Sequence, residues 1–134
     1  MLQTVIEQDT TCELPPQVKM ILSAMEAGTY RRAERRDKRR IRLHVQGLLR
    51  LFSDSPSVTP HTLYTRDIHS RAMGFITPSR LPLGYGGTLE LPHPDGGLFF
   101  IPCTIIRCRQ ALPGWYEGSV SFFRAQPEFD SLIA

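Results

Sequence analysis

The chain has 134 residues, of which 41 % are hydrophobic and 22 % are charged. This is the length and composition of one globular domain, and it excludes a chain that is mainly disordered or collagen-like. The 11 Pro and 10 Gly argue against a helical bundle, and the net charge of +3 is small.

The first predicted element is a helix of about three turns that begins near Pro16 and ends at Gly28. Proline is favoured in the first turn of a helix, and glycine just after its end. An apolar stripe at helical spacing comprises Val18, Ile21, Leu22 and Met25. We expect this stripe to pack on its own domain, with a partner protein or a second copy of the chain as the alternative. Residues 1–13 are polar and mixed.

A basic segment follows over residues 30–40. Half of the sixteen basic residues fall within twelve positions, namely Arg31, Arg32, Arg35, Arg36, Lys38, Arg39, Arg40 and Arg42. The segment has no apolar face, so we expect an exposed arm. Such a block is suited to phosphate groups, and a merely solvated charged segment is the alternative.

After the arm, the hydrophobic period changes to two. Apolar residues or glycine occupy the odd positions of residues 41–51, which predicts a long strand with one buried face. Further strands are expected at residues 62–68, 73–76, 87–91, 99–106 and 116–122. Pro102 cannot donate to a strand ladder, which places it at an edge or a bulge.

Six short strands after a helix predict an all-β fold, namely a small six-stranded antiparallel barrel with an N-terminal helix and a basic arm. A sandwich is the alternative. The expected organisation is a tail and helix at residues 1–29, the barrel domain with its arm at 30–126, and a C-terminal tail at 127–134. That tail is long enough for a short turn of helix.

Nothing in the spacing of the nucleophilic and basic residues indicates catalysis, and no nucleotide-binding loop or metalloprotease motif is present. We therefore expect no enzyme, no cofactor and no metal site. Cys12, Cys103 and Cys108 are expected to be reduced structural thiols. The absence of a predicted signal peptide or membrane-spanning segment indicates a cytoplasmic protein.

Two segments carry residues that could bind a ligand: the end of the basic arm, and the turn that follows Asp67. In the arm, Arg36-x-x-x-Arg40 stands directly before the first strand, with Arg35 in front of it. In the turn, the residues read Asp67-x-His69-x-x-Ala72. Together they resemble the PilZ family, whose signature is R-x-x-x-R before the first strand and [D/N]-x-S-x-x-G at a later strand turn. The resemblance covers residues 30–123.

The resemblance implies a six-stranded barrel that binds cyclic di-GMP through the residues at these positions, namely Arg35, Arg36, Arg40, Asp67, His69, Ser70 and Ala72. Guanidinium groups pair bidentately with phosphate oxygens and with guanine O6 and N7. A carboxylate can accept from the guanine N1–H and N2–H groups. Ligand binding would order the arm, and a partner protein would read that change.

The sequence departs from the family pattern at two positions. His69 stands in place of the serine, and the adjacent Ser70 could supply a hydroxyl instead. Ala72 stands in place of the glycine, which would cost about 1 kcal/mol if the position required a positive φ. The R-x-x-x-R motif can also be aligned in other ways within the arm, with Arg35 and Arg39, Arg32 and Arg36, or Arg31 and Arg35 as its two arginines.

Two other classes of function remain open beside a cyclic di-GMP receptor. One is a PilZ-like domain that has lost or weakened its ligand site and acts through protein–protein contacts, with a homodimer as one form. The other is a barrel that binds nucleic acid through its basic arm. The second is disfavoured because most aromatic residues fall at buried strand positions, whereas a base-stacking platform needs exposed aromatic side chains.

Overall fold

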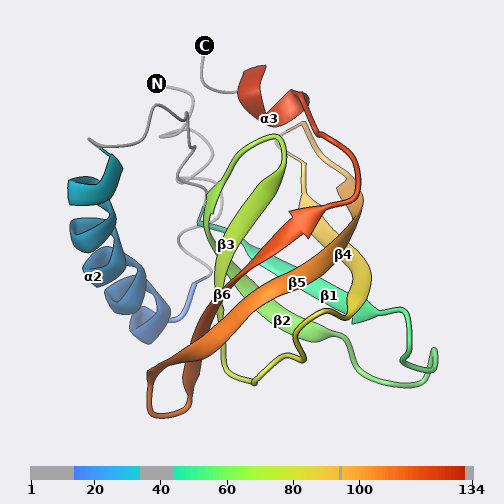
Figure 1. The fold of residues 1–134 in the computed structure, drawn as a ribbon, viewed down its shortest axis with the longest axis horizontal. Coiled ribbons are helices and arrows are strands. Elements are labelled where there is room, and N and C mark those ends of the chain that lie inside the picture. The colour runs from blue at the N-terminus through green and yellow to red at the C-terminus, as the bar shows by residue number, and fades with distance from the viewer. Residues whose placement is uncertain (1–13, 34–43, 94, 132–134) are drawn as a thin grey trace.

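The computed structural model describes residues 14–33, 44–93 and 95–131, and for residues 25–33, 130 and 131 it describes the backbone only. One long helix precedes six strands, and a short helix follows them (Figure 1). The elements are α2 (Pro16–Ala33), β1 (Gln46–Leu51), β2 (His61–Ile68), β3 (Ala72–Thr77), β4 (Gly86–Pro92), β5 (Leu98–Leu112), β6 (Trp115–Phe122) and α3 (Glu128–Ser131).

The six strands form a closed antiparallel barrel, which confirms the predicted fold class. Their order around the barrel is β1-β2-β3-β6-β5-β4, and β4 pairs again with β1. Side chains alternate between the two faces of a strand, so every second residue points inward. The interior is filled by apolar side chains that include Leu49, Leu63, Met73, Phe75, Leu89, Ile101, Ile105 and Val120.

Helix α2 lies against the outside of the barrel, beside β3 (Figure 1). Val18, Ile21 and Leu22 are buried there against Ile76 of β3. Three of the four residues in the predicted stripe therefore pack on their own domain, as expected; the side chain of Met25 lies outside the described residues.

The helix does not end at Gly28 as predicted, but continues to Ala33. A glycine inside a helix costs about 1 kcal/mol relative to alanine, which weakens a helix without ending it. The first residues of the expected arm, 30–33, are therefore helical.

Strand β5 is longer than predicted and runs to Leu112. The closed barrel leaves no sheet edge at Pro102, which pairs with Thr88 of β4 inside the ladder. The expectation of an edge or a bulge at Pro102 is wrong. The carbonyl of Pro102 accepts from the backbone N of Phe123, one residue beyond the end of β6. The N and O of one residue point to the same side of an antiparallel strand, so the missing N–H faces the place where β6 ends.

The predicted C-terminal helical turn is present as α3, and it closes one end of the barrel core. Phe129 is fully buried, and its ring centroid lies 4.9 Å from that of Phe99 and 6.1 Å from that of Phe122. The segment expected to be a tail thus contributes to the core. Among the described residues, no helix has both the length and the apolar character to cross a membrane.

Candidate functional site

The chain enters the barrel beside the second motif. The backbone N of Thr65 donates to the carbonyl of Val45, and the hydroxyl of Thr65 accepts from the backbone N of Val45, both at 2.9 Å. Arg35, Arg36 and Arg40 lie outside the described residues. Arg40 precedes Val45 by five residues, which can span at most about 18 Å. Val45 is therefore held two residues before Asp67, within that chain length of the end of the basic segment.

A bulge in β2 determines where Asp67 stands. The register shifts between Thr65, which pairs with Phe75, and Asp67, which pairs with Gly74. Phe75 belongs to the core, so Gly74 faces outward, and a Cβ built on it would meet Arg66 and Asp67. The bulge thus turns two consecutive side chains, Arg66 and Asp67, onto the outer wall.

Asp67 is firmly held in this position. Its Oδ1 accepts a hydrogen bond from the backbone N of Gly74 at 3.2 Å, and its Oδ2 lies 3.6 Å from Nε of Arg66. The residue is 6 % exposed. The carboxylate is fixed in orientation by these two contacts.

The turn after β2 is anchored by its own hydrogen bonds and by the C-terminal segment. The backbone N of His69 donates to the carbonyl of Ala72, and Nδ1 of His69 accepts from the backbone N of Arg71 at 3.2 Å. The carbonyls of Ser70 and Arg71 accept from the backbone N of Gln126 and Phe122. Because Nδ1 is an acceptor, the geometry fits an imidazole that carries its proton on Nε2.

Ala72 does not carry the strain considered for it. It is the first residue of β3 and pairs with Ser121, and no described residue other than glycine has a positive φ. Alanine therefore fits this position without backbone cost.

The structure brings a further set of residues to the same wall, which the sequence did not indicate. Glu117 is 4 % exposed, and Oε2 accepts from Nη1 of Arg66 at 3.2 Å and from Nη2 of Arg107 at 3.0 Å. Its Oε1 accepts from Nε of Arg109. We call Arg66, Asp67, Arg107, Arg109 and Glu117 the charged cluster. Its side chains form a continuous chain of ion pairs from β2 to β5.

The wall between the two ends of the charged cluster is made of small residues. Asp67 pairs with Gly74, Gly74 with Ser119, and Ser119 with Arg107, so these four positions form one row across β2, β3, β6 and β5. The next row contains Ala72 and Ser121. The Arg66 guanidinium lies over Gly74, so the charged cluster forms the surface above these small residues. A surface of guanidinium groups and carboxylates suits an anionic ligand with hydrogen-bonding groups.

The described cysteines are buried or half-buried free thiols. Burial raises the pKa of Cys103 from 9.0 to about 12, which suppresses the reactive thiolate. The Sγ of Cys108 accepts from the backbone N of Leu81 at 3.3 Å. Cys12 lies outside the described residues, and within them no group of three or more His, Cys, Asp or Glu could hold a metal ion.

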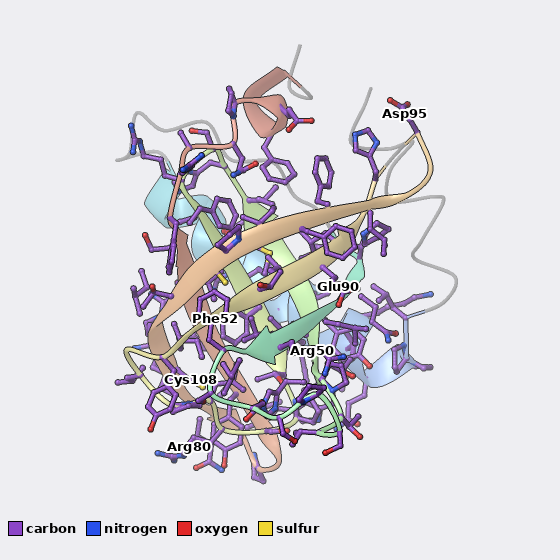
Figure 2. All side chains as sticks on the ribbon, turned by 90° about the vertical axis from the view of Figure 1, so that its right-hand side faces the viewer. Arg50, Phe52, Arg80, Glu90, Asp95 and Cys108 are labelled. Carbon is purple, nitrogen blue, oxygen red and sulfur yellow. The ribbon has the colours of Figure 1, made fainter. Side chains whose placement is uncertain are left out.

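The argument against nucleic-acid binding assumed that most aromatic side chains are buried, and this is wrong for four of them. Phe52, Tyr85, Phe100 and Phe123 are 50–62 % exposed. Figure 2 shows Phe52 near Arg50 on the wall that faces the viewer. The rings of Phe52 and Phe123 meet edge to face with centroids 6.2 Å apart. Their exposure follows from their places outside the alternating core positions, Phe52 and Phe123 being the residues directly after β1 and β6.

Comparison with protein-family models, with curated proteins and with solved structures gives no match to this chain.

Proposed function

We propose that this chain is a PilZ-like receptor domain that binds cyclic di-GMP on the outer wall of the barrel, between the basic segment and the turn after Asp67. The observation that supports this most directly is the pair of hydrogen bonds between Val45 and Thr65. They hold Val45, five residues after Arg40, beside the strand that carries Asp67. The chain length between them allows the two motifs to meet at one ligand site.

The chemistry of the two segments is complementary to the ligand. Arginine side chains present paired N–H donors for the phosphates and for the guanine O6 and N7 edge. The Asp67 carboxylate, held by its contacts to Gly74 and Arg66, is an acceptor of the kind that pairs with the N1–H and N2–H groups of a guanine. The hydrogen bonds of the turn at His69–Ala72 hold this edge of the site in place.

In this proposal the domain is a binding module and not an enzyme, and it has no cofactor. Binding would fix the arginine segment against the barrel wall, and a partner protein would recognise the fixed form. A change in the order of a segment is a common way in which a bound nucleotide is read.

The test is calorimetric titration of the chain with cyclic di-GMP, with GTP as a non-cyclic guanine nucleotide, and with a short single-stranded oligonucleotide. We expect saturable 1:1 or 1:2 binding of cyclic di-GMP alone. Asp67→Asn should weaken this binding, whereas Arg50→Ala, on β1 at the end remote from the arm, should not. Binding of the oligonucleotide alone would replace the proposal by nucleic-acid recognition. The absence of any binding would favour a PilZ-like domain that acts through protein contacts.

A further inference from the structure

The charged cluster extends the candidate site beyond both sequence motifs. We propose that Arg107 and Arg109 of β5 bind the phosphodiester oxygens of the ligand, and that the buried Glu117 is the positioning residue that holds their guanidinium groups toward it. This inference rests on the proposed function, because it adds residues of β5 to the same ligand site.

The first support is the placement of Arg107. The register of β5 shifts between Ile105, which pairs with Val120, and Arg107, which pairs with Ser119. Ile105 is buried in the core, and Cys108 packs against it. Without the bulge, strict alternation would turn Arg107 inward, into an apolar core. The bulge instead turns it onto the wall that Arg66 and Asp67 reach through the bulge of β2. Bulges of this kind are enriched beside binding sites, where they re-aim a side chain.

The second support is the combination of a buried anchor with exposed donors. Glu117 is 4 % exposed, whereas the side chains of Arg107 and Arg109 are 42 % and 64 % exposed. A guanidinium group carries five N–H donors, of which each of these two arginines gives one to Glu117. Nε of Arg107 is buried, and the solvent-exposed donors among the others are available to a ligand. A guanidinium group already fixed by a carboxylate loses less conformational freedom when a ligand binds.

The third support is charge and space. Three arginines and two carboxylates leave the charged cluster with one net positive charge. Asp67 and Arg107 end a row of four strands, which places their backbones about 14 Å apart along the wall. Gly74 and Ser119 lie between them in that row, and the Arg66 guanidinium lies over Gly74 on its way to Glu117. A ligand with two phosphates and two bases that contacts Asp67 at one end and Arg107 or Arg109 at the other would therefore lie across Arg66.

The experiment measures the affinity of cyclic di-GMP for the full chain and for Arg107→Gln, Arg109→Gln and the matched control Arg50→Gln. Loss of a charge-assisted hydrogen bond should weaken binding about tenfold or more for each cluster variant. The control should bind like the unaltered chain, because Arg50 contacts the carbonyl of Val58 at the opposite end of β1 from the arm. Arg109→Lys, which keeps the charge and loses the fork, should fall between Arg109→Gln and the unaltered chain.

The positioning role of Glu117 has its own readout. Glu117→Gln should weaken binding in the unaltered chain but have little further effect in the Arg107→Gln, Arg109→Gln double variant, since its influence passes through those two arginines. Thermal unfolding of every variant shows whether the barrel is intact. Arg109 is exposed enough that its replacement will leave the fold in place, so at least this variant reports on binding.

The outcomes distinguish the receptor function from the role of β5 in it. If the unaltered chain binds cyclic di-GMP and folded Arg107→Gln and Arg109→Gln bind equally well, the role of these two arginines is refuted while the receptor function stands. An equal loss for Glu117→Gln in both backgrounds refutes its positioning role. If the unaltered chain does not bind cyclic di-GMP, the receptor function and the inference fall together.

Discussion

Thr65 holds Val45 through both its backbone and its side chain, with two hydrogen bonds of 2.9 Å. Both residues are buried, at 0 % and 1 % exposure. The pair extends the pairing of β1 with β2 by one residue, to the residue before β1. A single buried hydroxyl thereby helps to hold the start of the first strand in place.

Replacing Thr65 with valine should therefore reduce stability. The substitution keeps the shape of the side chain but leaves the buried N–H of Val45 without its acceptor, at a cost of about 1–3 kcal/mol. Chemical denaturation followed by tryptophan fluorescence measures the loss. Thr65→Ser is the matched control, because it retains the hydroxyl. Equal stability of the valine and serine variants would show that this hydrogen bond contributes nothing.

Arg36→Ala and Arg40→Ala should each weaken cyclic di-GMP binding by about 1.5–3 kcal/mol, the scale of a charge-assisted hydrogen bond. Their melting temperatures should stay close to that of the unaltered chain, since the segment has no apolar face to bury. Calorimetry and thermal unfolding check both parts. Unaltered affinity in both variants would move the contacts to Arg35 with Arg39, or to Arg32.

Leu22→Asp should destabilise the fold strongly. Leu22 is 1 % exposed in the cluster that joins α2 to Ile76, and burial of such a side chain is worth about 1.5–3 kcal/mol even before a charge is placed there. Met20 on the same helix is 65 % exposed, so Met20→Asp is the control. Thermal unfolding should separate the two variants clearly. Similar melting temperatures would mean that the helix adds little to the stability of the barrel.

The turn at Asp67–Ala72 departs from the PilZ pattern at His69 and Ala72, and restoring that pattern tests whether the difference matters for binding. The double variant His69→Ser, Ala72→Gly should bind cyclic di-GMP at least as tightly as the unaltered chain, because it removes the bulk of the imidazole. Ala72→Gly alone should lower stability by about 0.5–1 kcal/mol without improving affinity, since Ala72 lies in a strand and its φ is not positive. Affinity and unfolding measurements on the three proteins decide the point. A chain that binds only after restoration would be a domain that has lost its nucleotide.

Cys103 should make stability fall at alkaline pH. Its pKa is raised to about 12 in the folded state from an ordinary value of 9.0. Between these values the unfolded chain binds fewer protons than the folded one, so stability decreases as pH rises from about 9 towards 12. Denaturation of the unaltered chain and of Cys103→Ala across this range should show a smaller slope for the variant. Identical slopes would exclude this thiol as the cause.

The strands could be predicted from the sequence because their burial alternates with a period of two, as in β1, where Gly47, Leu49 and Leu51 all point inward. The boundaries were less accurate. Gly28 signals a helix end, yet α2 continues past it, because one unfavourable residue does not end a helix that goes on into the strong helix formers Arg31, Arg32 and Ala33. Phe129 follows no strand pattern, and only the folded barrel shows that its ring fills one end of the core.

The site was predictable only where it followed a linear motif. The turn of Asp67 could be located from its residues, whereas Glu117 looks like any outward residue of an alternating strand. Its burial depends on Arg66, Arg107 and Arg109, which come from two other strands. Bulges add to the difficulty, because one unpaired residue reverses the expected face of every residue that follows, and the local composition does not indicate those at Arg66 and Ile106.

The bulges in β2 and β5 also make the outer wall sensitive to residue number as well as residue type. Substitution at Arg66 changes one side chain, whereas its deletion would restore regular pairing, leave Asp67 opposite Gly74 on the outer wall, and remove the local bend and added twist of the strand. Deletion of Ile106 would likewise leave Arg107 opposite Ser119 but straighten β5 there. Relatives of this chain that lack the extra residue in either strand would therefore present Asp67 and Arg107 on the same face of a less twisted wall.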